Sequence, residues 1–144
     1  MNKSIFLLVS LFLMVVVINF FNNLHSDFDF VSAAGRGDIV AVRNGVRKGI
    51  DINKTKMQSA TANYYAIAHQ QVEIVKFLLS NGADPNIGLN KAISLQNFEI
   101  TEMLLQQGAS VSRIQQGENK TALEIANLTG NAKMFKLVFK YYKN

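Results

Sequence analysis

Hydrophobic and polar positions divide the chain into two parts. From Ile5 to Phe21 the only polar residues are Ser10 and Asn19, whereas charged residues are scattered through the sequence after Asn22. An apolar run of 17 residues lies at the border between the core of an export signal and a membrane-spanning helix. The run has no polar helix face, which argues against a buried core helix. The first part is therefore predicted to be one hydrophobic helix, and the second a globular domain.

In the second part, an apolar pattern with helical spacing recurs. Segment 70–86, QQVEIVKFLLSNGADPN, superimposes without gaps on segment 96–112, QNFEITEMLLQQGASVS, and further copies begin at positions 37 and 130. An alanine stands four residues before each copy, where a small side chain lets two helices pack closely. The starting positions are 33, 26 and 34 residues apart. The second part is therefore predicted to contain four pairs of helices.

The pattern resembles the ankyrin repeat, whose period is about 33 residues and whose first helix opens with T-P-L-H-x-A. Thr121-Ala-Leu-Glu-Ile-Ala126 is the nearest match to that motif, and Asn81-Gly-Ala-Asp-Pro-Asn86 matches the repeat end. The resemblance implies an all-α ankyrin-repeat solenoid of helix pairs with short hairpin loops, preceded by one N-terminal hydrophobic helix. The expected domains are a leading segment at 1–26 and repeats at about 27–53, 61–86, 87–112 and 121–144.

Departures from the family pattern predict an irregular stack. The proline of the motif is absent from every copy, and Gln70 and Gln96 stand where the family has glycine between the paired helices. If these glutamines adopt positive φ, each costs about 1 kcal/mol. The period of 26 between the second and third copies leads Asn86 almost directly into the next helix. One hairpin loop is therefore expected to be lost or very short.

The repeats are expected to bury their apolar faces by stacking, because a single helix pair cannot do so alone. Phe30 is expected in the core of a capping first helix. The aromatic last helix, with Phe135, Phe139, Tyr141 and Tyr142, is interpreted as the other cap, and an exposed aromatic patch is the alternative. The predicted core residues of the repeats are Ile74, Phe77, Leu78, Met103, Leu104, Leu105 and Leu137.

The hydrophobic segment has two interpretations, an uncleaved single-pass anchor or a signal peptide that is removed to give a secreted protein. Lys3 precedes the apolar run, whereas Asp27 and Asp29 follow it before the first positive charge, Arg36. The positive-inside rule then leaves the N-terminus in the cytoplasm and the domain outside it, in a periplasmic or other extracytoplasmic space. Cleavage near Ser26 would use a poor site, because no A-x-A motif precedes it. This favours membrane attachment through the N-terminal segment.

Composition narrows the possible functions. The chain has 144 residues, enough for one domain with a modest core, and no cysteine, which excludes disulfides and thiolate metal sites. The formal net charge of +5 is mild beside the dense basic clusters of nucleic-acid binders. The high content of Asn, Lys and Ile suggests an AT-rich genome and favours a bacterial source. The terminal lysines are interpreted as a solvated helix face, at Lys133, Lys136, Lys140 and Lys143.

No pattern of residues supports catalysis. The sequence has no cysteine nucleophile and no glycine-rich phosphate loop, and its two histidines, His25 and His69, are not at metal-ligand spacing. We therefore expect no enzymatic activity, no cofactor and no metal. We also expect no nucleic-acid or small-molecule partner, and a monomeric protein.

The resemblance implies a protein partner, bound along the concave groove through loop tips and the inner face of the first helices. Leu95 and Leu128 have two readings, as apolar anchors in the groove or as side chains that tilt back into packing. A degenerate structural protein without a specific partner is the alternative function. The predicted protein-binding residues are Arg36, Lys56, Met57, Gln58, His69, Ser94, Leu95, Lys120, Leu128 and Thr129.

Overall fold

The computed structural model describes residues 3–54, 60–114 and 118–142, without the side chains at 3, 4, 23, 24, 27 and 28. Within these residues the chain is all-helical, as predicted. The helices in chain order are α1 (Lys3–Arg36), α2 (Ile39–Arg47), α3 (Ala62–Ala68), α4 (Val72–Ser80), α5 (Leu89–Ser94), α6 (Phe98–Gln106), α7 (Ala122–Leu128) and α8 (Ala132–Tyr142).

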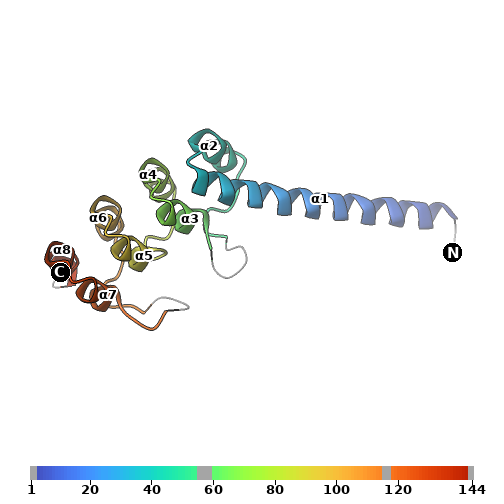
Figure 1. The fold of residues 1–144 in the computed structure, drawn as a ribbon. Coiled ribbons are helices and arrows are strands. Elements are labelled where there is room, and N and C mark those ends of the chain that lie inside the picture. The colour runs from blue at the N-terminus through green and yellow to red at the C-terminus, as the bar shows by residue number, and fades with distance from the viewer. Residues whose placement is uncertain (1–2, 55–59, 115–117, 143–144) are drawn as a thin grey trace.

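The helices form a row of four pairs (Figure 1). The end of α1 and helices α3, α5 and α7 follow one another along one side of the row, which we call the inner side. Helices α2, α4, α6 and α8 follow one another along the outer side. Each helix contacts the equivalent helix of the next pair, so the predicted stacking of repeats is confirmed.

The core runs along this row. Phe30 is 4% exposed, and the four recurring alanines, at 33, 66, 92 and 126, are all buried. These small residues permit the close helix packing that the sequence predicts. Of the predicted core residues, Ile74, Leu78, Leu104 and Leu105 are buried, while Phe77, Met103 and Leu137 are partly buried and pack against the core.

The turns between paired helices adopt left-handed backbone conformations. The φ angles are 84° at Gly37, 57° at Gln70, 54° at Gln96 and 67° at Gly130. The two glutamines therefore carry the predicted strain of a side chain at positive φ. Their carboxamides also accept hydrogen bonds from the next repeat, at 3.3 Å from Asn97 Nδ2 and at 2.8 Å from Asn131 Nδ2. A glycine could not make these contacts between repeats.

Threonine caps start two of the inner helices. Thr61 Oγ1 accepts from the backbone N–H of Tyr64 at 3.2 Å. Thr121 forms a capping box with Glu124, whose carboxylate accepts from the Thr121 backbone N–H at 2.7 Å and from its hydroxyl at 2.9 Å. These hydrogen bonds lower the pKa of the Glu124 carboxyl, because they stabilise its charged form.

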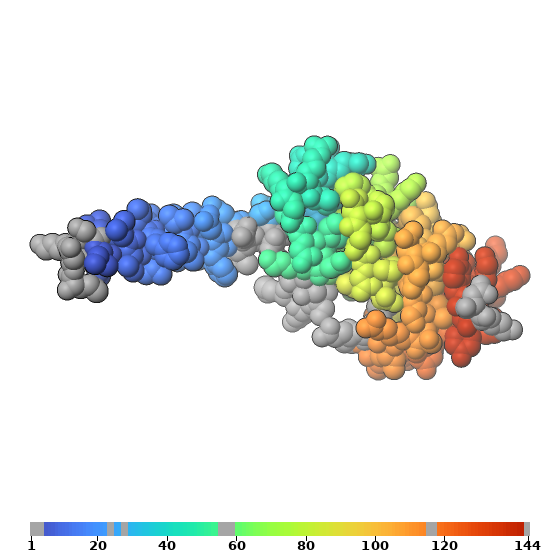
Figure 2. Space-filling view, turned by 180° about the vertical axis from the view of Figure 1, so that it is seen from behind, coloured from blue at the N-terminus to red at the C-terminus, as the bar shows by residue number. Residues whose placement is uncertain are grey.

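The hydrophobic segment and the first inner helix form one continuous helix, α1. The polar stretch after Asn22 contains no glycine or proline before Gly35, so nothing in it breaks the helix. The environment changes along α1: residues 5–22 are exposed, whereas Phe30, Val31 and Ala33 are buried against the repeats. Figure 2 shows the exposed part projecting away from the rest of the molecule.

Among the described helices, only α1 is long and apolar enough to span a membrane. Its window Ile5–Asn22 has a mean hydropathy of 2.6 and no buried residue. A signal sequence has the same length and composition. The segment is therefore a candidate membrane span or a candidate signal sequence.

Candidate functional site

The connections between successive repeats differ in length. Residues 48–61 join α2 to α3, and residues 107–121 join α6 to α7; we call these segments the first and second fingers. Only residues 81–88 join α4 to α5, although this connection occupies the equivalent place between the second and third repeats (Figure 1). The predicted loss of one hairpin loop is confirmed.

Gly88 makes the short connection possible. Its φ of 90° lies in the left-handed region, and it directly precedes α5. A Cβ atom at this position would lie 2.6 Å from Cδ1 of Ile67, a fully buried residue of α3. The backbone therefore passes directly over the core, which only glycine permits without a shift of Ile67.

A hollow of about 280 Å³ lies between the second and fourth repeats on the inner side, where the finger is missing. We call this hollow the slot. Helix α5 supplies its floor, helix α3 one wall, and the end of the second finger with α7 the other wall. The lining residues are Tyr64 from α3; Asn90, Lys91 and Ser94 from α5; Glu118, Asn119 and Lys120 from the second finger; and Ile125 from α7.

Asn90 joins the floor of the slot to the second finger. Its Nδ2 donates to the backbone carbonyl of Lys120 at 3.2 Å and to the carboxylate of Glu118. Two acceptors on one side fix the orientation of the carboxamide, because only its nitrogen can donate to both. Asn90 is 3% exposed, and its Oδ1 has no hydrogen-bond partner. The residue on the floor of the slot therefore has a buried acceptor atom without a partner.

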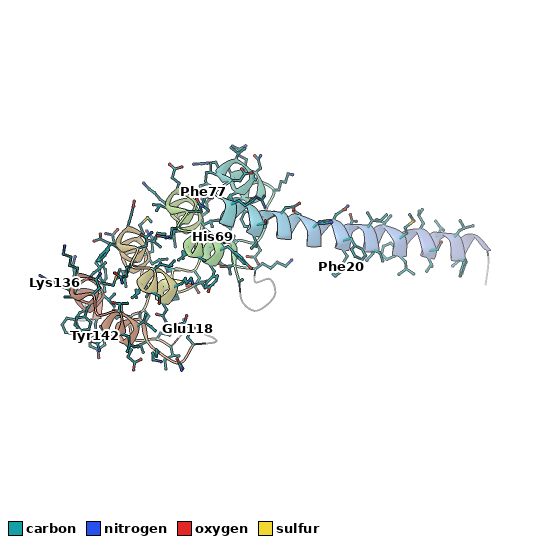
Figure 3. All side chains as sticks on the ribbon, in the orientation of Figure 1. Phe20, His69, Phe77, Glu118, Lys136 and Tyr142 are labelled. Atoms are coloured by element: carbon teal, nitrogen blue, oxygen red, sulfur yellow. The ribbon has the colours of Figure 1, made fainter. Side chains whose placement is uncertain are left out.

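The ionisable groups of the slot carry a positive excess. Lys91 and Lys120 are half-buried, and within the described part of the chain neither ammonium forms an ion pair. Lys120 Nζ donates to Asn119 Oδ1 at 3.4 Å, and its charge also interacts with the carboxylate of Glu124, which does not line the slot. Partial burial raises the pKa of the Glu118 carboxyl, which disfavours its charged form. Figure 3 shows Glu118 on the second finger, at the inner side of the row.

Several predicted binding residues lie at the ends of the inner helices, next to the turns. Arg36 ends α1 and donates to Ser32 Oγ, while His69, Leu95 and Thr129 are the C-caps of α3, α5 and α7. His69 is exposed, yet its ring lies close to Gly35. In Figure 3 it lies at the end of α3, between the first and second repeats.

The two leucines with alternative readings differ from each other. Leu128 is 65% exposed at the end of α7, whereas Leu95 is half-buried. Leu128 occupies the same repeat position as Ser94, which lines the slot. Leu128 therefore faces the inner side, where a partner can reach it, whereas Leu95 is partly used in packing.

The structure brings two of the predicted binding residues, Ser94 and Lys120, together in the slot. Lys56, Met57 and Gln58 lie outside the described residues. The other polar residues of the slot were not predicted from the sequence; they are Tyr64, Asn90, Lys91, Glu118 and Asn119. The shortened period was the signal that could have found them, because a missing finger must leave its neighbours uncovered.

Within residues 3–54, 60–114 and 118–142, no group of three or more His, Asp or Glu side chains is placed to hold a metal ion. A second hollow, of about 510 Å³, lies between α1 and α2 at the end of the row. Polar side chains from α1 line it together with Lys48, including Asn22, His25 and Asp29.

Comparison with known proteins agrees with this architecture. The family model described as Ankyrin repeat matches residues 63–88, which contain α3 apart from its first residue, α4 and the short connection. The match confirms the resemblance that the repeated segments indicate.

Two of the relatives are named as ankyrin repeat proteins, and a third is named as a palmitoyltransferase. Fowlpox virus protein FPV222, named as an ankyrin repeat protein, is 30% identical over 146 residues, covering 74% of this chain and 19% of that protein. Fowlpox virus FPV018, also named as an ankyrin repeat protein, is 34% identical over 62% of this chain and 15% of that protein. The palmitoyltransferase akr1 of Schizosaccharomyces pombe is 44% identical over 38% of this chain and 9% of that protein. The chain thus spans less than a fifth of the length of these relatives.

Proposed function

Because this chain is built of ankyrin repeats, we propose that it is a protein-binding module that holds its partner along the inner side of the stack. Ankyrin repeats generally imply protein partners. Stacked repeats bind through the extended surface that their row of helices creates. The partner of this chain would lie across α3, α5 and α7 and against the fingers.

Exposed side chains on the inner helices carry this proposal. Leu128 is 65% exposed and Tyr65 is 39% exposed. Tyr65 occupies the same repeat position as Lys91 and Ile125, which line the slot, so these exposed groups belong to one side of the row. Apolar groups combined with a polar hollow are typical of a surface that a partner covers.

The predicted binding residues divide into two sets within this surface. We propose that Ser94, Lys120 and Leu128 contact the partner directly. Arg36, His69, Leu95 and Thr129 would form the border of the contact at the turns between paired helices. Among these groups, Leu128 is the best single position for a test, because its exposure makes a substitution harmless to the fold.

Affinity capture with the full chain in detergent tests the proposal. Leu128→Arg is expected to lose the partner, because it places a charge within an apolar contact. Val40→Arg is the matched control, because Val40 is also 65% exposed but lies on the outer helix α2. Equal recovery of the same proteins by both variants, with unchanged melting curves, would refute binding through the inner side.

We propose further that residues 1–26 anchor residues 27–144 to a membrane, with the repeats outside the cytoplasm. The exposed apolar window Ile5–Asn22 supports an anchor, and the charges on its two sides support this orientation. Because α1 continues into the first repeat, the anchor and the stack would move as one rigid unit. Secretion after cleavage is the alternative.

A reporter fused after Asn144 tests this topology, combined with measurement of the protein's size. Activity of a reporter that functions only in the cytoplasm would contradict the proposed orientation. A loss of about 26 residues in mass, matching the leading segment, would replace the anchor with a cleaved signal.

A degenerate repeat protein without a specific partner is the second candidate. Asn63 and Thr101 favour it, since both are buried with side-chain atoms that lack hydrogen-bond partners. Such groups cost about 1–3 kcal/mol each. A non-cooperative melt of the full chain would support this candidate, whereas a sharp single transition would support a folded binding module.

A further inference from the structure

The two sides of the slot differ in how they are covered. Asn90 on α5 is tied to the second finger through Lys120 and Glu118. Tyr64 occupies the same repeat position on α3, but the finger that would cover it is missing. Tyr64 is half-buried and lines the slot, and its hydroxyl has no hydrogen bond to any described residue. The slot is therefore the place of an absent finger.

The groups that face this place favour an acidic occupant. Lys91 stands on the floor and Lys120 on the wall, and neither ammonium forms an ion pair within the described residues, although the charge of Lys120 also interacts with the Glu124 carboxylate. The one carboxyl in the slot, Glu118, accepts its hydrogen bond from an amide, not from either lysine. A carboxylate brought near the lysines would gain charge-assisted hydrogen bonds that the free protein lacks.

The dimensions of the slot favour an extended segment. A hollow of about 280 Å³ is open along the inner side but too small for a helix with its side chains. The first and second fingers, which lie on either side of the missing one, are each a single loop of chain.

We propose that the slot binds an extended acidic segment of the partner protein, which takes the place of the missing finger and sets its carboxylates against Lys91 and Lys120. This proposal rests on the protein-binding function proposed above and specifies where on the inner side the partner engages. The shortened repeat would then select partners that carry such an acidic segment. An intact array of fingers would have no room for such a segment.

Peptide binding to the full chain in detergent micelles tests the proposal. The probe is an acetylated and amidated ten-residue peptide of Gly and Ser with two central Glu residues; matched peptides carry Gln or Lys there. The Glu peptide is expected to bind at least about tenfold more tightly than the Gln peptide, because a charge-assisted hydrogen bond exceeds a neutral one. Higher salt should weaken this preference. Equal affinity of the three peptides would overturn the proposal.

Charge variants locate the bound peptide. Lys91→Glu and Lys120→Glu are each expected to weaken the Glu peptide about tenfold or more, whereas Glu118→Gln should tighten it by removing a repelling carboxylate. Lys76→Glu on the outer helix α4 is the control and should change nothing. If Lys91→Glu unfolds the protein, the affinities of Lys120→Glu and Glu118→Gln still test whether the peptide binds in the slot. An identical affinity of Lys120→Glu, Glu118→Gln and the unaltered chain would overturn the assignment.

A variant in which the missing finger is restored tests whether the peptide binds in the slot, because the added finger would fill it. A copy of residues 107–121 in place of residues 81–87 keeps Gly88 and fills the slot, so it should abolish binding of the Glu peptide. Retained binding in a cooperatively folded variant would contradict the proposal. Failure of the slot is distinguishable from failure of the proposed function. If Leu128→Arg still loses the captured partner, the inner side binds elsewhere than the slot, and only the acidic-segment proposal falls.

Discussion

The junction between the second and third repeats and the junction between the third and fourth solve the same packing problem with different amounts of chain. Both join an outer helix to the next inner helix, with eight residues at the first junction and 15 at the second. In both, the inner and the outer helices of adjacent repeats remain in contact. Stacking of the repeats in this protein therefore depends on contacts between the helices and not on the fingers.

The two junctions also differ in the surface that they give to the inner side of the stack. The second finger is held by the buried Asn90, whereas the shorter junction instead depends on a glycine packed against Ile67. The finger adds polar surface on the inner side, and its absence adds a hollow there. A stack can therefore change its binding surface by changing connections while its core stays the same.

Gly88→Ala is the substitution with the largest expected effect on this comparison. The added Cβ meets both the left-handed backbone and Cδ1 of Ile67, so we expect a loss of about 2–4 kcal/mol of unfolding free energy. Gly108→Ala, at the longer junction, is the control: φ is 92° there, but no atom lies within 4 Å of the added Cβ. Its loss should be only about 1 kcal/mol. Equal losses in denaturant unfolding would show that the short junction is not tightly packed.

Asn63→Leu is expected to stabilise the second repeat. Asn63 occupies the repeat position of Leu89 and Leu123, and both of its amide atoms are buried without partners. Removal of these groups should raise the free energy of unfolding by about 1–3 kcal/mol. A decrease in the melting temperature would show that the Asn63 amide has a partner or a bound water in solution.

Gln70→Gly and Gln96→Gly compare the turns on either side of the short junction. Glycine removes the left-handed strain of about 1 kcal/mol, but it also removes the hydrogen bond from Asn97 or Asn131. The bond to Gln96, at 2.8 Å, is shorter than that to Gln70, at 3.3 Å. Gln70→Gly should therefore raise the free energy of unfolding more than Gln96→Gly does. The opposite order in urea unfolding would show that the hydrogen bond to Gln70 is worth more than the one to Gln96.

Glu124→Gln has the smallest expected effect and depends on pH. Hydrogen bonds from Thr121 lower the pKa of the Glu124 carboxyl below its usual value of 4.5. The charged carboxylate therefore stabilises the fold above about pH 4.5, and this contribution is lost as the pH falls through the lowered pKa. Melting curves of variant and unaltered chain should differ near pH 7 and converge at about pH 3. A difference that persists at low pH would assign the effect to packing.

Much of the fold follows from the sequence because helix spacing and repeat spacing are local signals. The positions of Ile74 and Leu104 in the core follow from superposition of the repeats, whereas the left-handed turns at Gln70 and Gln96 were expected only from the glycine that the ankyrin family has there. The shortened period likewise predicts the missing finger. The continuity of α1 through the polar stretch was not predicted, although the absence of glycine and proline there permits it.

The slot could not be predicted in the same way. Its walls come from residues such as Tyr64 and Lys120, which are far apart in sequence and meet only because two repeats flank a missing finger. The unpartnered state of Asn90 Oδ1 is likewise a property of three-dimensional packing. A sequence pattern identifies what is missing from a repeat but not which groups the loss leaves facing one another.

Site-specific photo-crosslinking in living cells tests whether this chain binds a protein through its inner side. A photoreactive aromatic residue would replace Tyr65 on the inner helix α3 in one variant and Lys76 on the outer helix α4 in the other. We expect one discrete protein adduct from position 65 and none from position 76. Matching adducts from both positions, or an adduct from position 76 alone, would contradict binding through the inner side.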